Sequence, residues 1–126
     1  MKKQIVHTKT APAAIGPYSQ AIRVDNTVYL SGQIPLDPLT MELVKGGIEE
    51  QSRQVFKNLK EVASASGFDL LHIVKLTIYL VDMDDFPCVN KVMSDFFEEP
   101  YPSRSTIGVA SLPKAAKVEI DATIVV

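Results

Sequence analysis

The strongest constraint on the fold of this 126-residue chain is an alternation of apolar and polar residues near its C-terminal end. Successive side chains of a β-strand point to opposite faces, so such alternation predicts strands that bury one face. We expect one strand over residues 104–109 and another over residues 117–124, joined by a turn at residues 113–116. If the two strands pair as a hairpin, Arg104 and Glu119 project from the same face, away from the core.

Arg104 and Glu119 are the candidate catalytic residues. The planar guanidinium of an arginine binds a carboxylate through two parallel hydrogen bonds and stays charged at any working pH. A nearby carboxylate can position a water molecule and move its protons. Together the two groups suit the hydrolysis of a small acid. The competing interpretations are an ordinary surface or interface ion pair for Arg104, and charge complementarity with Lys117 for Glu119.

Two amphipathic helices are expected between further strands. Apolar residues recur at helical spacing after Gly46-Gly47 and again after Asp82 or Asp84. Gly67 is suited to the C-terminal end of the first helix, and either aspartate can cap the second. Further strands are predicted over residues 5–7, 18–24, 27–34 and 73–81.

The order of these elements predicts a single α+β domain over residues 1–126. Two helices can cover only one face of such a sheet, which gives two layers. The other face is too aromatic for a plain solvent face and too polar for a core, so it is a candidate subunit interface. A bulge at Gly32 or Gly108 would reverse the faces beyond it. The residues expected on this open face are Tyr29, Ser31, Gln33, Lys75, Thr77, Tyr79, Arg104, Thr106, Lys117, Glu119 and Asp121.

Composition and charge argue against several classes of protein. The net charge is −2 without a lysine or arginine cluster, which disfavours a nucleic-acid partner. The single Cys88 rules out an internal disulfide, and His7 and His72 lack metal-ligand spacing, so we expect no metal. The N-terminal residues lack the apolar segment of a signal peptide, and no apolar stretch is long enough to span a membrane. A cytoplasmic protein is therefore expected.

A series of short motifs in a fixed order carries more specific information. It includes APAAIGPYSQ at residues 11–20, SGQIP at residues 31–35, PSRSTI at residues 102–107, and the stretch from LPK to VEI at residues 112–120. Each motif alone is weak, but all of them in this order resemble the RidA (YjgF) family of enamine/imine deaminases. The resemblance runs nearly from end to end of the chain, and the segment from Arg104 to Glu119 corresponds to the family's own signature.

The resemblance implies both an assembly and a reaction. The fold would be a chorismate-mutase-like homotrimer with a mixed sheet and with sites in the clefts between subunits. The reaction would be hydrolysis of 2-aminoacrylate- and 2-aminocrotonate-type enamines and imines, which leak from pyridoxal-phosphate-dependent dehydratases, to 2-keto acids and ammonia, without a cofactor. The alternative is a non-catalytic regulatory module of the same fold that binds small carboxylates. Glu119 favours the enzyme, because a pure carboxylate binder needs no carboxylate in its pocket.

Four further residues are candidates for substrate binding. Tyr18 would bring a hydroxyl into a neighbouring subunit's cleft, or else pack on a strand. Ser31 and Gly32 end a strand where a ligand can approach the backbone and use a free N–H, or else they form a bulge without a ligand. Asn90 lies at the edge of an apolar helix stripe, where its amide needs partners from a ligand or from a loop backbone.

Thr106 is the last candidate for substrate binding, because its alternation places it on the face of Arg104. The competing interpretation is a β-branched residue that merely fills the strand. The family often has a cysteine at this position, and many members have a tyrosine where this chain has Met93. These departures leave the arginine and the glutamate of the signature in place.

Overall fold

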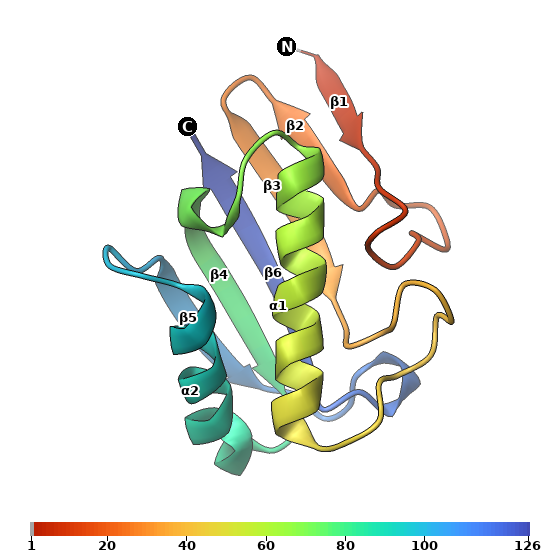
Figure 1. Ribbon diagram of the computed structural model, residues 1–126, viewed down its shortest axis with the longest axis vertical. Helices are drawn as coiled ribbons and strands as arrows, with labels where there is room; N and C mark the ends of the chain where they lie inside the picture. The colour runs from red at the N-terminus through yellow and green to blue at the C-terminus, as the bar shows by residue number, and fades with distance from the viewer. Residues whose placement is uncertain (1) are drawn as a thin grey trace.

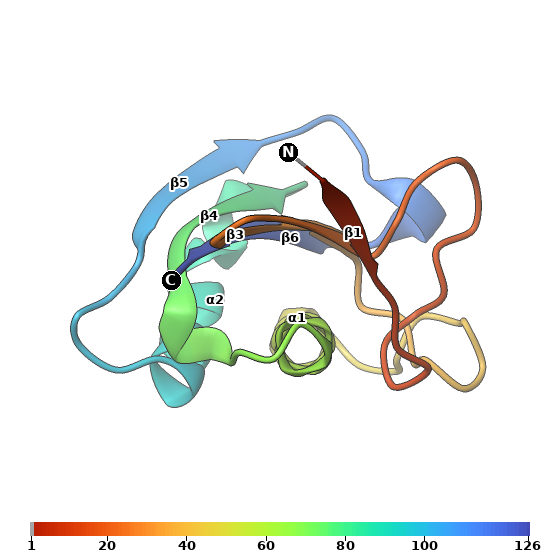
Figure 2. The same cartoon turned by 90° about the horizontal axis from the view of Figure 1, so that it is seen from above.

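A mixed six-stranded sheet forms one layer of the protein, whose computed structural model describes residues 2–126 (Figure 1). The strands lie side by side in the order β1-β2-β3-β6-β4-β5, and all neighbours are antiparallel except β4 and β5. Both helices cover the same face of the sheet, as predicted (Figure 2). The elements are β1 (Lys3–Val6), β2 (Ala21–Val24), β3 (Thr27–Gln33), α1 (Ile48–Ala65), β4 (Ile73–Leu80), α2 (Phe86–Phe96), β5 (Ser103–Gly108) and β6 (Val118–Val125).

Helix α1 begins and ends at the residues that the sequence indicated. The carboxylate of Glu50 accepts a hydrogen bond from the Gly47 N–H at 2.7 Å, which satisfies one of the unpaired donors at the start of the helix. After the last helical residues, Gly67 adopts a φ of 93°, a left-handed conformation that glycine takes without strain. The glycines on either side of this helix therefore fix its length.

Helix α2 begins a few residues later than predicted. The Asp82 carboxylate accepts a hydrogen bond from the Asp84 N–H at 2.9 Å and starts a 3-10 turn over Met83–Asp85. The α-helix follows from Phe86, with Pro87 in its first turn, where a missing N–H costs little. Asp82 thus caps the 3-10 turn that precedes α2.

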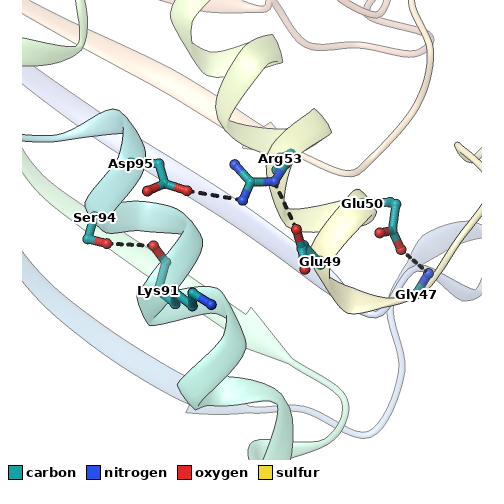
Figure 3. Close-up of polar contacts among 7 residues, drawn as sticks. All are labelled: Gly47, Glu49, Glu50, Arg53, Lys91, Ser94 and Asp95. Carbon is teal, nitrogen blue, oxygen red and sulfur yellow. Dashed lines mark hydrogen bonds and ion pairs between the residues drawn. The ribbon is translucent and has the colours of Figure 1, made fainter.

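An ion pair joins the two helices on their outer side, among the polar contacts that Figure 3 shows in detail. Arg53 of α1 forms an ion pair with Asp95 of α2 at 3.0 Å and another with Glu49 at 3.3 Å. Such exposed pairs contribute little to stability. Packing beneath them is more important, because the buried ring of Phe56 stacks on Phe96 with ring centroids 5.3 Å apart.

The core lies between the helices and one face of the sheet. Alternation predicted the buried face of β6 correctly, and the residues of β4 from Leu76 onward follow the same rule. These faces pack against the apolar stripes of α1 and α2. The buried side chains of the two central strands include Leu76, Ile78, Leu80, Val118, Ile120, Ala122 and Ile124.

Two irregularities in strand register shift residues between faces. The pairing of β3 with β6 slips between Leu30 and Gln33, so Gln33 is buried and not on the open face as predicted. The conditional expectation of a bulge at Gly32 therefore holds, since one extra residue reverses the alternation. A second slip in β4 buries Ile73 and leaves Val74 44% exposed, the reverse of what strict alternation from Lys75, Thr77 and Tyr79 on the open face would give.

The predicted hairpin of the last two strands is wrong. β5 pairs in parallel with β4, and β4 stands between β5 and β6. β4, α2 and β5 form a β-α-β unit, in which a helix supplies the crossover that parallel strands need. Arg104 lies beside Leu76 in this register, so it projects from the face that the helices cover. Thr106 lies beside the buried Ile78 and shares that face, again contrary to prediction.

Among residues 2–126, neither helix combines the length and the apolar composition that crossing a membrane requires.

Candidate functional site

Arg104 is held against helix α2 by three contacts. Its Nη1 donates a hydrogen bond to Asn90 Oδ1 at 2.6 Å and lies 3.6 Å from Met93 Sδ. The guanidinium carbon also lies 5.0 Å from the centroid of the Phe86 ring, a cation–π contact. The predicted candidates Arg104 and Asn90 are therefore brought together, and the Asn90 amide oxygen accepts from a side chain where the sequence suggested a ligand or a loop backbone. Asn90, Arg104 and Met93 are called the arginine cluster below.

A pocket of about 440 Å³ adjoins the arginine cluster. The donors that Arg104 does not use for Asn90 remain available to a ligand, since a guanidinium carries five N–H groups. The hydrogen bond to Asn90 fixes the plane of the guanidinium before a ligand binds. The pocket is lined by Asn90, Met93, Ser94, Tyr101, Pro102 and Arg104.

Glu119 lies on the open face of the sheet, in the middle of the molecule. Its carboxylate rests against Gly32 of the neighbouring strand, where an added Cβ would overlap Glu119 Oε2 and the carboxyl carbon. The absence of a side chain at Gly32 thus lets the Glu119 carboxylate lie close to the backbone, where the sequence suggested the approach of a ligand. Burial, and next the negative charge of Asp121, raise the pKa of the Glu119 carboxyl above its usual value.

A second pocket, of about 530 Å³, has Gly32 and Tyr18 among the residues that line it. Its lining is mainly apolar, and Lys114 closes one side by donating a hydrogen bond from Nζ to the Met41 carbonyl oxygen at 3.3 Å. Tyr18, Gly32 and Glu119 are called the glutamate cluster below. The pocket is lined by Pro12, Ala13, Ile15, Tyr18, Gln20, Gly32, Gln33, Ile34, Leu36, Met41, Pro113 and Lys114.

Ser31 makes hydrogen bonds within the chain in place of the expected contact with a ligand. Its N–H donates to the Gln20 carbonyl oxygen at 3.0 Å, and its Oγ donates to the Ser19 carbonyl oxygen at 2.5 Å. The sequence suggested that a backbone N–H at Ser31 or Gly32 is free to bind an anion. The N–H of Ser31 is instead already hydrogen-bonded within the chain. Both bonds attach the segment that carries Tyr18 to strand β3, so Ser31 acts on the pocket through its neighbour.

The arginine and glutamate clusters lie on opposite faces of the sheet. Arg104 and Thr106 point to the helix side from the edge strand β5, whereas Glu119 points to the open side from β6. The prediction that Arg104 and Glu119 share one face of one chain is therefore wrong. The error follows from the assumed hairpin, because a strand's own alternation does not reveal which strand lies beside it.

Tyr79 and Asp121 form a polar contact beside Glu119 that was not predicted from the sequence. The Tyr79 hydroxyl donates a hydrogen bond to Asp121 Oδ2 at 2.9 Å. That bond, then burial and the charges of Asp121 and Glu119, raise the pKa of the Tyr79 hydroxyl. Alternation placed all three residues on the open face, but the pairing of β4 with β6 was needed to find the contact.

Residues 2–126 hold no group of three or more histidine, cysteine, aspartate or glutamate side chains placed to bind a metal ion.

Comparison with known proteins identifies the class of domain over nearly the whole chain. Residues 8–126 match the family model described as Endoribonuclease L-PSP. A 2-iminobutanoate/2-iminopropanoate deaminase from Dermatophagoides farinae is 50% identical over 124 residues, which cover 98% of this chain and 97% of that protein.

Two solved structures share the fold. A putative endoribonuclease from Thermotoga maritima is 48% identical, with a TM-score of 0.96 and coverage of 100% of this chain and 98% of that one. RidA from the Antarctic bacterium Psychrobacter sp. is 46% identical, with a TM-score of 0.94 and coverage of 98% and 99%. The chain belongs to the Endoribonuclease L-PSP family, also called the RidA (YjgF) family, as its motifs predicted.

Proposed function

We propose that this protein is an enamine/imine deaminase that hydrolyses 2-aminoacrylate- and 2-aminocrotonate-type intermediates to 2-keto acids and ammonia. The observation that carries the proposal is the carboxylate of Glu119, which lies partly buried against Gly32, a residue that lines the second pocket, and whose pKa is raised. A general base works best when its pKa approaches the working pH. The description of the Dermatophagoides relative as a deaminase supports the same activity.

The proposed reaction divides the chemistry between the two catalytic residues. An enamine first becomes the imine when its terminal carbon gains a proton and its nitrogen loses one. Arg104 binds the substrate carboxylate, and Glu119 takes a proton from water as the oxygen adds to the imine carbon. Return of protons to nitrogen releases ammonia and leaves the carbonyl group. Water and the imine supply every atom of the products, so no cofactor enters the balance.

We further propose that Arg104 and Glu119 meet across the boundary between two copies of the chain, in a chorismate-mutase-like homotrimer. Within one chain the two residues point away from opposite faces of the sheet, and a small imino acid is too short to contact both. Tyr29 on the open face is 55% exposed, and an exposed aromatic side chain of this kind is typical of an interface. Cyclic assembly would bring the arginine cluster of one copy to the glutamate cluster of the next.

The remaining candidates have positions around the substrate in this proposal. Tyr18 and Gly32 border the apolar pocket, which suits the short hydrocarbon part of the substrate. Asn90 orients the guanidinium of Arg104, and Thr106 lines the same side of β5. Ser31 holds the Tyr18 segment in place.

Mixing two inactive variants tests the shared site. Arg104→Ala chains keep Glu119, and Glu119→Gln chains keep Arg104, so some clefts of a mixed trimer contain both native residues. Random mixing of equal amounts should restore about a quarter of the wild-type activity, because each cleft draws its two residues from different subunits. Mixed trimers that stay as inactive as their parents would show that both residues act from one chain or not at all.

A coupled assay tests the activity itself. A pyridoxal-phosphate-dependent threonine dehydratase releases the unstable intermediate, and the appearance of the 2-keto acid is timed with and without this protein. Acceleration that Glu119→Gln abolishes supports the deaminase. Unchanged timing, together with binding of small carboxylates, would favour the regulatory module instead. The proposal links the protein to such dehydratases and therefore to the cytoplasm where they work.

A further inference from the structure

Tyr79 crosses the open face from one acidic residue to the other. In the antiparallel pairing of β4 with β6, Tyr79 lies directly opposite Glu119, and Thr77 lies opposite Asp121. The Tyr79 hydroxyl nevertheless donates to Asp121, the diagonal neighbour, at 2.9 Å. Aromatic side chains are long enough for such diagonal contacts. The side chain of Tyr79 therefore starts opposite Glu119 and ends at Asp121.

The surroundings of Glu119 hold one charge of the same sign close by. Asp121 is two residues along the same strand and faces the same way, at a spacing of about 7 Å. Lys117 precedes Glu119 on that face but is exposed, and the ion pairs found within residues 2–126 do not include Glu119. Strand β3 contributes Gly32 and Tyr29. Strand β4 contributes Tyr79 and, four residues earlier on the same face, the exposed Lys75.

We propose that Asp121, held in place by Tyr79, is a positioning residue for Glu119: it fixes a negative charge beside that carboxylate and so sets the pH at which Glu119 takes up and releases a proton. The inference rests on the proposed function, because it assigns Asp121 and Tyr79 to the general base of the deaminase. Neither residue needs to touch the substrate.

The chemistry of imine hydrolysis gives this arrangement a purpose. Glu119 must accept a proton from water and then deliver one to the departing nitrogen, so it must hold the proton neither too weakly nor too tightly. Burial alone raises the affinity of Glu119 for its proton, and a second carboxylate at a fixed place raises it further. A mobile Asp121 side chain would do this less reproducibly, which is why the hydrogen bond from Tyr79 matters.

Two substitutions separate the charge of Asp121 from its hydrogen bond. Asp121→Asn removes the charge but keeps an oxygen that accepts from Tyr79, whereas Tyr79→Phe keeps the charge and removes the donor. Asp121→Ser removes the same charge with a smaller side chain and is measured alongside, in case Asp121→Asn folds poorly. Glu61→Gln, on helix α1 in the other layer, is the control for loss of one negative charge.

Two readouts distinguish failure of this inference from failure of the proposed function. The first is the pH dependence of kcat/KM in the coupled assay. The second is the pH titration of the ¹³C-labelled carboxyl of Glu119, assigned by its disappearance in Glu119→Gln, which needs no turnover. If wild-type protein is inactive but the titration responds as described below, only the deaminase is refuted.

The expected results have defined directions. Asp121→Asn should move the Glu119 midpoint and the acidic limb of kcat/KM to lower pH, and Glu61→Gln should move neither. Tyr79→Phe should give a smaller shift in the same direction, and the double variant should match Asp121→Asn, because Tyr79 then has no charge to position. An unmoved midpoint in Asp121→Asn and Asp121→Ser would overturn the role of Asp121. A double variant that differs from Asp121→Asn would overturn the role of Tyr79.

Discussion

At the scale of single residues, substitution of Arg104 tests the proposed chemistry most directly. We expect Arg104→Ala to lower kcat/KM of a folded protein by at least about tenfold, because a hydrogen bond to a charged group is worth about 1.5–3 kcal/mol and about 1.4 kcal/mol corresponds to a factor of ten. Loss of both bonds of a bidentate pair would give about a hundredfold or more. Arg53→Ala, which removes an arginine from the helix surface, is the matched control, and near-normal activity of Arg104→Ala would make Arg104 structural.

Glu119→Gln separates a catalyst from a carboxylate binder. The change keeps the size of the side chain but removes the basic oxygen, so turnover should fall by about 10²-fold or more. Binding of a 2-keto acid, measured by calorimetry, should persist or tighten, because a negative charge near the ligand is gone. Full turnover with weakened binding would instead indicate that Glu119 only supports the pocket.

The same substitution should also change stability with pH. The pKa of Glu119 in the folded chain is raised by burial and then by Asp121, so the folded chain holds this proton more tightly than the unfolded chain. The stabilisation is complete below the unfolded pKa and is lost as the pH rises through the folded pKa. Glu119→Gln should therefore melt at a higher temperature than wild type at neutral pH, with the difference shrinking in acid. A difference that does not change with pH would contradict this account.

At the scale of elements, the position of the Glu119 carboxylate against β3 depends on Gly32. A Cβ at this position would overlap the Glu119 carboxylate, which is the flexible end of a side chain, so Gly32→Ala should displace that carboxylate and lower the activity, with a smaller loss in melting temperature. Adding Glu119→Ala should recover much of the lost stability but none of the activity, since the overlap is removed together with the base. Equal and additive losses in the double variant would show that the two residues do not compete for space.

The strands also show what alternation in a sequence can and cannot reveal. The alternation of β6 was predicted correctly, because a strand with a core on one face keeps a strict period of two. The partner of β5 was not, since the same period fits a hairpin with β6 and a parallel pair with β4. Arg104 was consequently assigned to the wrong face. The diagonal contact of Tyr79 with Asp121 could not be predicted without the register of β4 against β6, because the two residues are 42 positions apart in the sequence.

At the scale of the whole molecule, the open sheet face should be covered in the assembled protein. Tyr29→Asp introduces a charge on this face, where Tyr29 is 55% exposed in the single chain. We expect native mass spectrometry to find trimers for wild type and smaller species for Tyr29→Asp, with activity lost and secondary structure kept. Lys57→Glu on helix α1 changes charge on the other layer and should remain trimeric. A wild-type protein that is a stable monomer would refute the assembly and its shared clefts.

The placement of Arg104 and Glu119 on opposite faces of one sheet has a consequence for how the enzyme responds to its own abundance. If each working centre draws one residue from either side of a subunit boundary, an isolated chain carries both residues and yet has no complete centre. Specific activity should then fall on dilution below the dissociation constant of the assembly, and it should return on reconcentration without any change in the chain. Freshly made chains would stay inert until they find partners.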